Sequence, residues 1–126
     1  MKNTSHLVVI LFLVFVFPQC SSPQRAKTNQ TTKKETSIKK QIENGAFLVD
    51  VRTPEEYAEG SVKGAVNIPL DQIPNRLEEF EGKTSVIVFC RSGNRSGQAK
   101  SILEAKGIQN VTNGINTENL NQELGK

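Results

Sequence analysis

Between residues 37 and 126, short apolar runs alternate with polar segments that carry helix signals. The apolar runs have the length of buried strands, and the segments between them have the length of short helices. We expect strands over 46–51, 65–68, 85–89 and 109–112. We expect helices over 37–43, 53–60, 71–80 and 97–106. Strands that alternate with helices predict an α/β fold, in which a small parallel sheet has helices on both faces.

Local capping chemistry indicates where two of these helices begin. Thr53 is predicted as a helix cap, with Pro54 at the first helical position and Glu56 at the third. In the helix expected over 71–80, Pro74 restricts the first turn, because proline has no N–H group to donate. The first of these starts is therefore the better defined.

The N-terminus has the pattern of a targeting segment. Residues 7–17 form an uninterrupted run of eleven apolar residues, which is too short to span a bilayer but is typical of a signal peptide. We therefore expect residues 1–20 to be a signal peptide or a lipoprotein signal. Residues 21–36 contain no aliphatic side chain larger than alanine, so we expect a flexible polar tether there. A domain over 37–126 follows.

Cys20 raises a separate question about the mature N-terminus. An apolar run, a cysteine and small polar residues resemble a bacterial lipoprotein signal, in which Cys20 would become the lipidated first residue. The match departs at Gln19, where a small residue is usual, and at Phe17, where leucine is usual. Lipidation, cleavage to a soluble form and an uncleaved anchor all stay open. Export to a bacterial cell envelope is expected, as a periplasmic protein or one attached to a membrane through its N-terminus.

The distribution of charge narrows the function classes. The 126 residues have a formal net charge of +3. Residues 25–40 hold six lysines and arginines against one acid, whereas residues 41–126 hold nine against twelve. A mildly acidic domain argues against nucleic-acid binding, which needs basic residues on the folded face. No cysteine or histidine cluster has metal-ligand spacing, so we expect no metal and no cofactor.

The candidate chemistry lies in the segment from Cys90 to Ser96, which follows a predicted buried strand and opens a predicted helix. Backbone N–H groups in such a loop, and the positive end of the helix, favour an anion. Arg91 and Arg95 add positive charge, and all of these effects lower a thiol pKa. With Cys20 lipidated or removed, Cys90 is the single cysteine of the mature chain and is expected to be a free thiol.

Two stretches of the chain resemble single-domain rhodaneses: LVDVRTPEEYAEGSVKGAVNIPL over 48–70 and VIVFCRSGNRSGQAKSILEAKGIQNV over 86–111. The resemblance covers approximately residues 37–115. It implies the rhodanese-like fold and a sulfurtransferase in which Cys90 forms a persulfide. The form CRSGNRSGQAK is most similar to small bacterial rhodaneses, some of which are exported.

The resemblance also implies the reaction and its partners. The Cys90 thiolate would take a sulfur atom from thiosulfate or a related donor and pass it to a thiol or cyanide. No histidine follows His6, so no imidazole can act as a base. The protein is expected to be a monomer. The residues expected to bind the substrate are the six after the cysteine: Arg91, Ser92, Gly93, Asn94, Arg95 and Ser96.

Asp50 and Arg52, at the end of another predicted strand, either support the site or form an internal ion pair, and the ion pair is the preferred interpretation. The chain also departs from the family at two places. Ser61 stands where many members have histidine, which is usually a structural position. Residues 113–116 have one glycine where many members have a pair, and the chain lacks tryptophan. The last helix and the rim of the pocket are therefore the least defined.

Two other functions stay open. Phosphatases and arsenate reductases of rhodanese-like fold resemble this chain, but they usually have a longer loop with an arginine six positions after the cysteine. Here that position is Ser96, so the loop length favours sulfur over phosphate. An intact Cys90 loop does not exclude a non-catalytic persulfide carrier or binding module.

Overall fold

A computed structural model describes residues 37–126. The expected signal over 1–20, lipidation at Cys20 and tether over 21–36 lie outside the described residues. Across residues 37–126, no helix has both the length and the apolar character needed to cross a membrane.

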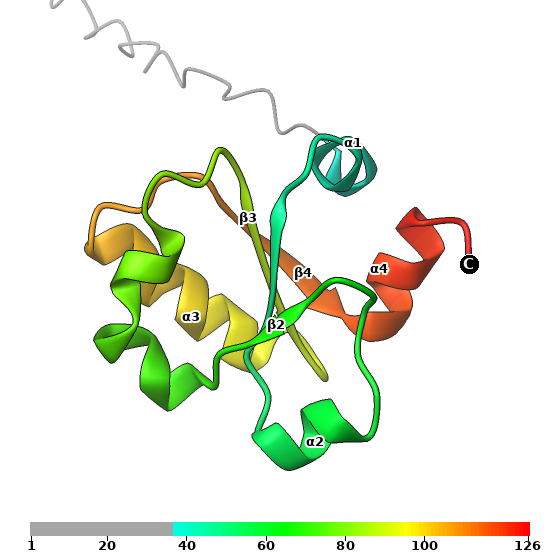
Figure 1. Cartoon of the computed structure of the whole chain (residues 1–126), viewed down its shortest axis with the longest axis horizontal. Coiled ribbons are helices and arrows are strands. Elements are labelled where there is room, and N and C mark those ends of the chain that lie inside the picture. The colour runs from blue at the N-terminus through cyan, green and yellow to red at the C-terminus, as the bar shows by residue number, and fades with distance from the viewer. Residues whose placement is uncertain (1–36) are drawn as a thin grey trace, which may run out of the picture. The chain divides into compact units, whose positions relative to one another are not determined.

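A four-stranded, all-parallel sheet forms the centre of the described chain (Figure 1). Its strands are β1 (Phe47–Asp50), β2 (Val66–Asn67), β3 (Val86–Cys90) and β4 (Val111–Asn116). They lie in the order β2-β1-β3-β4, so β1 and β3 are the interior strands. Both faces of an interior parallel strand are buried, which is why these two segments are nearly continuous apolar runs. The predicted α/β fold is confirmed.

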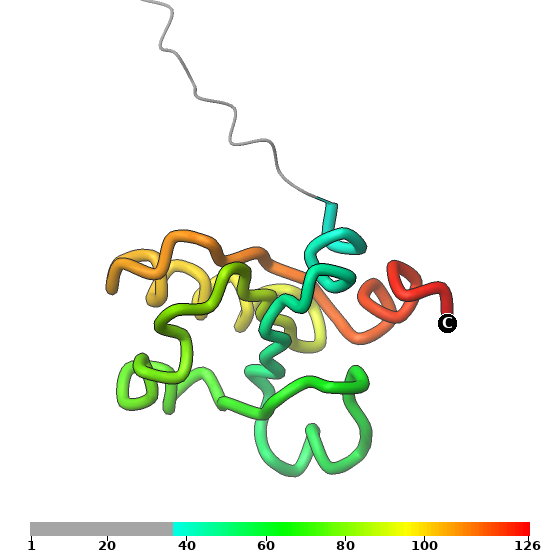
Figure 2. Tube along the Cα trace, turned by 45° about the horizontal axis from the view of Figure 1, so that its top comes forward, coloured from blue at the N-terminus to red at the C-terminus, as the bar shows by residue number. Residues whose placement is uncertain are grey.

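Helices cover both faces of the sheet, as the sequence pattern predicts (Figures 1 and 2). The α-helices are α1 (Ile38–Glu43), α2 (Pro54–Ala58), α3 (Asn94–Ala105) and α4 (Thr117–Glu123). Two 3₁₀ helices, η1 (Leu70–Asn75) and η2 (Leu77–Phe80), come between β2 and β3. Helix α3 packs with η1 and η2 on one face, and α1 and α4 pack together on the other.

The alternation of side chains along β3 decides which face Cys90 occupies. Val86, Val88 and Cys90 belong to the core beneath α3, whereas Ile87 and Phe89 belong to the core beneath α1 and α4. Successive side chains of a strand point to opposite faces, so this pattern follows from the strand geometry. Cys90 therefore ends β3 on the face that α3 covers.

Helix α2 begins as predicted. The Thr53 hydroxyl accepts from the Glu56 N–H, and the Glu56 carboxylate accepts from the Thr53 N–H at 3.1 Å, while Pro54 occupies the first helical position. Both hydrogen bonds of this capping box lie within four residues of sequence, so neither needs a partner from the sheet. It fixes the backbone that carries Glu56.

The prediction of a single helix over 71–80 is wrong. The segment forms η1 and η2 instead, separated at Arg76, whose φ is −129°. Pro74 lies inside η1 and cannot donate the bond to the residue four positions earlier that an α-helix requires. The 3₁₀ turns are closed by other donors, with the Gln72 N–H bound to the Pro69 carbonyl and the Arg76 N–H bound to the Ile73 carbonyl.

Two boundaries near the site also differ from the prediction. Helix α3 begins at Asn94 rather than at residue 97, because Gly93 has a φ of 87° and turns the chain directly into the helix. Strand β4 lies over 111–116 rather than over 109–112, and α4 follows it at once. Much of the segment expected to be a loop is therefore the first turn of α3.

A β-bulge lies in β4 next to this turn. The register to β3 shifts after the Val88–Asn113 pair, and Gly114 is the extra residue. A Cβ atom at Gly114 would lie 2.8 Å from Ile87 Cγ2, so a larger residue does not fit without rearrangement. The next residue, Ile115, has a φ of 68°, which is unusual for a β-branched side chain. The bulge therefore lies at the part of β4 that contacts Gly93 of the Cys90 loop.

Candidate active site

Cys90 ends β3 as a free thiol and is buried, with 1% of the residue exposed. Residues Arg91 to Gly93 are the whole connection to α3. Because Gly93 adopts the left-handed conformation, the chain folds back over the sulfur, and the Gly93 N–H donates to Cys90 Sγ at 3.2 Å. This turn encloses the thiol with backbone donors, as expected for a site that stabilises an anion.

The surroundings of the thiol favour its ionised form. Burial raises the pKa of the Cys90 thiol, but hydrogen bonds from the Ser96 hydroxyl and from the N–H groups of Ser96, Ser92 and Gly93 outweigh it. They lower the pKa from an ordinary value of 9.0 to about 7. The N–H groups of Ser92 and Gly93 are the loop donors that are expected from the sequence to act on the thiolate. A larger fraction of this thiol than of an ordinary cysteine is therefore ionised at neutral pH.

Ser96 connects the thiol to strand β4. Its buried hydroxyl lies 3.5 Å from Cys90 Sγ and donates to Asn113 Oδ1 at 2.8 Å. Asn113 in turn donates from Nδ2 to the Gly93 carbonyl at 3.0 Å and accepts from the Ile115 N–H at 3.0 Å. One asparagine therefore holds both the left-handed turn and the hydroxyl nearest to the sulfur.

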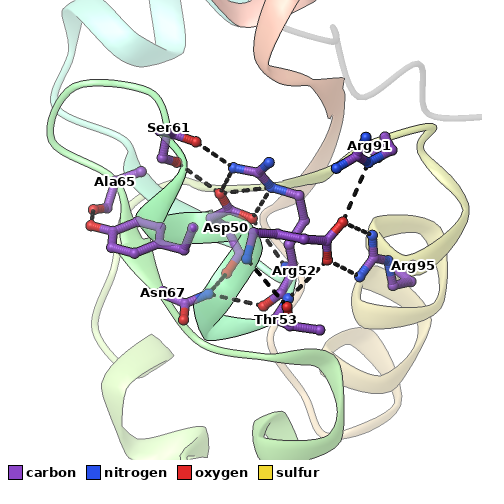
Figure 3. A network of polar contacts seen from close by, with 11 residues as sticks. Asp50, Arg52, Thr53, Ser61, Ala65, Asn67, Arg91 and Arg95 are labelled. Atoms are coloured by element: carbon purple, nitrogen blue, oxygen red, sulfur yellow. Dashed lines mark hydrogen bonds and ion pairs between the residues drawn. The ribbon is translucent and has the colours of Figure 1, made fainter.

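A single carboxylate, that of Glu56, binds both Arg91 of the loop and Arg95 of the first turn of α3, as Figure 3 shows. Arg95 donates from Nη1 and Nη2 to Glu56 at 2.7 and 3.0 Å, and Arg91 donates from Nε at 3.3 Å. The Arg95 hydrogen bonds, followed by that of the Thr53 backbone, lower the pKa of Glu56 to about 2. The hydrogen bonds of Glu56 raise the pKa of Arg95, and the Cys90 thiolate raises it further by a smaller amount.

Asp50 and Arg52 form an internal ion pair, in agreement with the preferred interpretation of the sequence. Arg52 donates to both carboxylate oxygens of Asp50, with Nη2 at 2.6 Å from Oδ2, and also to the Gly60 carbonyl (Figure 3). Ser61 donates its hydroxyl to the same carboxylate at 2.7 Å. The Asp50 hydrogen bond raises the pKa of Arg52 more than burial lowers it. This pair supports the backbone beside the site.

The structure brings most of the predicted site residues together, with different roles. Gly93 and Ser92 act through their backbone, and the side chain of Ser92 is exposed. Asn94 accepts from Gln98 Nε2 on the surface of α3, so its side chain is engaged along the helix. A shallow depression runs beside the loop along α3, lined by Gly93, Asn94, Gly97, Gln98, Ser101 and Ile102.

Sequence reasoning missed two residues of this site. Glu56 has a complete local explanation as part of a capping box, which concealed its contact with the loop. Asn113 precedes Gly114, which is a single glycine where many family members have two. That departure from the family pattern is the sequence feature that could have indicated Asn113. Among residues 37–126, no group of three or more cysteine, histidine or acidic side chains could hold a metal ion.

Comparisons with known proteins agree with this geometry. The rhodanese-like domain family matches residues 34–116. A sulfurtransferase of Allochromatium vinosum is 42% identical over 67 residues, which are 53% of this chain and 63% of the relative. Thiosulfate sulfurtransferase PspE of Escherichia coli is 42% identical over 67 residues, which are 52% of this chain and 64% of the relative. Each of these two matches therefore spans less than two thirds of this chain and less than two thirds of the relative.

Other similarities extend further along the chain. The uncharacterized protein YqhL of Bacillus subtilis is 31% identical over 107 residues, covering 85% of this chain and 84% of that protein. A solved structure of a rhodanese with anions from E. coli has a TM-score of 0.55 and 37% identity, covering 59% of this chain and 89% of that one. By its matched domain and its fold, the chain belongs to the rhodanese-like domain family.

Proposed function

We propose that the protein is a sulfurtransferase that carries a sulfane sulfur on Cys90. The observation that carries this proposal is the thiol itself, which lies among loop N–H donors and has a pKa of about 7. A thiolate at neutral pH is the form that attacks a sulfur electrophile. The sulfurtransferase names of two relatives support the same chemistry.

The first step needs no proton transfer. The Cys90 thiolate attacks the outer sulfur of thiosulfate, a bond forms between the two sulfur atoms, and the bond to the sulfonate sulfur breaks. Sulfite leaves with the electron pair of that bond, and the outer sulfur remains as a Cys90 persulfide anion. In the second step cyanide or a thiolate attacks that sulfur, and the Cys90 thiolate leaves. This scheme is consistent with a site that offers N–H donors but no imidazole.

The geometry favours sulfur transfer over phosphate or arsenate chemistry. The loop N–H groups of Ser92, Gly93 and Ser96 act on the Cys90 sulfur itself. A phosphatase needs such donors around a tetrahedral oxyanion beyond the sulfur, together with an arginine that clamps it. Here both terminal nitrogens of Arg95 are bound to Glu56.

Mass spectrometry of the Cys90 peptide tests the proposal. After reduction of the protein and removal of the reductant, thiosulfate should add one sulfur atom, about 32 Da, in the absence of thiols and cyanide, and cyanide should then remove it as thiocyanate. Cys90→Ser should gain nothing. A wild-type peptide that stays unmodified with thiosulfate would reject thiosulfate as the donor, and one that also stays unmodified with a small alkyl persulfide would reject the sulfurtransferase function. Sulfur uptake that stops after one equivalent, with no thiocyanate turnover, would identify the alternative persulfide carrier.

We also propose that the protein is exported to a bacterial cell envelope and anchored there by a lipid on Cys20. The support is the sequence alone: an apolar run over 7–17, then Cys20, then a polar segment. The mature N-terminus, sequenced from a membrane fraction, should be an acylated Cys20. A mature chain that begins after Cys20 would reject lipidation and leave export standing.

A further inference from the structure

One carboxylate, that of Glu56, binds both arginines near Cys90: Arg91 of the loop and Arg95 of the first turn of α3. Arg95 uses both of its terminal nitrogens for this carboxylate, in the bidentate geometry that makes guanidinium–carboxylate pairs strong. Arg91 contributes Nε alone, and its side chain is 67% exposed. Its terminal nitrogens make no hydrogen bond with any described residue. Of the two guanidinium groups, Arg91 therefore presents the more accessible hydrogen-bond donors to solvent.

This arrangement changes the charge that an incoming molecule meets. When Cys90 is ionised, the two positive charges of the arginines are matched by two negative charges, on Cys90 and Glu56. An anion that approaches the sulfur must compete with Glu56 for Arg95 or rely on Arg91. Each further negative charge on the incoming molecule increases its repulsion from Glu56 and the thiolate.

We propose that Glu56 is a specificity-determining residue that sets the charge preference of the site. By holding both arginines, it disfavours dianionic sulfur donors such as thiosulfate relative to donors with at most one negative charge, such as small alkyl persulfides. The proposal rests on the proposed sulfurtransferase function. With a persulfide donor, Cys90 Sγ forms a bond to the donor's terminal sulfur and the donor's sulfur–sulfur bond breaks. The donor's alkyl thiolate leaves with the electron pair of that bond.

Substitution, rather than pH, is the way to test this role. Glu56 stays ionised near neutral pH, because the Arg95 hydrogen bonds lower the pKa of its carboxyl to about 2. Glu56→Gln removes the charge and retains an oxygen that can accept from the Thr53 N–H, so the capping box at the start of α2 is retained. Glu55→Gln is the matched control. Glu55 is the exposed neighbour in the same helical turn and makes no ion pair with any described residue.

The first measurement does not depend on sulfur transfer. Cys90 in the full chain is alkylated by iodoacetate, which is negatively charged, and by iodoacetamide, which is neutral, and both rates are followed on the Cys90 peptide. Because both reagents react with the same thiolate, the ratio of the rates reports the local charge and cancels any change in the Cys90 pKa. Glu56→Gln should raise the iodoacetate-to-iodoacetamide ratio roughly threefold to tenfold. Glu55→Gln should leave it near the wild-type value.

The second measurement compares sulfur donors. Glu56→Gln should lower the KM for thiosulfate by a similar factor and leave the KM for the persulfide of 2-mercaptoethanol nearly unchanged. The rise in the alkylation ratio and the fall in the KM for thiosulfate should both become smaller at high ionic strength, because salt screens exposed charges. Glu55→Gln should change neither KM.

Several results would overturn the proposal. An unchanged or lower alkylation ratio in Glu56→Gln would show that the carboxylate only positions the two arginines and does not reduce their attraction for an incoming anion. An equal rise in Glu55→Gln would assign the effect to net charge alone. If Glu56→Gln fails to fold, Arg95→Gln must lower the ratio, and a ratio that does not fall rejects the proposal. If the wild type takes sulfur from neither donor, the proposed sulfurtransferase function is rejected, and so is the donor preference that rests on it. The alkylation ratio would still test whether Glu56 sets the local charge.

Discussion

The Ser96 hydroxyl donates to Asn113 Oδ1 at 2.8 Å and lies 3.5 Å from Cys90 Sγ. A hydroxyl has one proton, so Ser96 cannot donate to Asn113 and to the sulfur at the same time. With a thiol at Cys90, the chain of donors runs from sulfur to serine to asparagine. With a thiolate, the serine proton turns to the sulfur, and Asn113 keeps its bond from the Ile115 N–H. Ionisation of Cys90 and rotation of Ser96 are therefore coupled.

Ser96→Ala should raise the pKa of Cys90 towards the ordinary value of a thiol, because the thiolate loses its only side-chain hydroxyl donor among the described residues. Persulfide formation at pH 7 should slow by about tenfold, the usual effect of losing one hydrogen bond to a charged group. Ser92→Ala is the control, since Ser92 acts through its backbone N–H and its side chain is exposed. Alkylation rate against pH measures both variants. Equal pKa values in the two would contradict the role of Ser96.

The pH dependence of the wild type follows from the same thiol. The alkylation rate of Cys90 should rise through pH about 7 and then level off. The folded pKa is lower than that of an ordinary thiol at 9.0, so the unfolded chain binds more protons between these values. Ionisation of Cys90 therefore contributes stability that is fully present above pH 9.0 and is lost as the pH falls through about 7.

Chemical denaturation at both ends of this range checks the sign. The difference in stability between wild type and Cys90→Ser should become more favourable to the wild type as the pH rises from 7 to 9. Any loss of stability from other groups cancels in this comparison. A difference that is constant with pH would mean that the thiol titrates alike in the folded and unfolded chains.

Asn113→Asp should raise the pKa of Cys90 and destabilise the protein. The aspartate can still accept from Ser96, but it places a negative charge near the thiolate and a carboxylate oxygen against the Gly93 carbonyl. Asn110→Asp is the matched control, because Asn110 Nδ2 also donates to a backbone carbonyl, that of Lys83, before the start of β4. Loss of stability in both variants is expected, but only Asn113→Asp should alter the alkylation profile.

Asp50→Asn should destabilise the fold by about 3–5 kcal/mol, the usual cost of removing one partner from a buried ion pair. Asp50 is fully buried, and Arg52 would lose the carboxylate that accepts from Nε and Nη2. Glu79→Gln, in the partly exposed pair with Arg76, should cost much less. Denaturant melting of the three proteins gives the comparison. A small loss in Asp50→Asn would mean that Arg52 finds water or another partner.

The parts of the fold that could be predicted from the sequence are those that neighbouring residues determine. The apolar run before Cys90 is buried on both faces, and the capping box of Thr53 and Glu56 closes within four residues, so both patterns are readable without the fold. The prediction of one helix over 71–80 failed because it confined the effect of Pro74 to the first turn, whereas the segment forms two short helices divided at Arg76. The start of α3 failed because the left-handed turn at Gly93 follows from the loop as a whole.

The relationships that define the site could not be predicted in the same way. Glu56 and Arg95 are 39 positions apart, and Ser96 and Asn113 are 17 positions apart. They meet because a parallel sheet brings the loop after β3 beside α2 and beside the bulge in β4. Sequence periodicity shows which residues are buried, but it does not show which ends of different strands lie together.

Ile115→Asn should stabilise the protein by about 1 kcal/mol, because asparagine tolerates the left-handed conformation that costs a β-branched residue roughly that much. Ile115 has a φ of 68° and is 44% exposed, so little apolar burial is lost. Ile115→Ala should gain less, because alanine lacks the short polar side chain that makes the left-handed conformation tolerable for asparagine. The Ile115 N–H to Asn113 bond is a backbone contact, so the Cys90 pKa should stay near 7 in both variants. A lower melting temperature in Ile115→Asn would mean that packing of the Ile115 side chain near Gly93 outweighs the backbone strain.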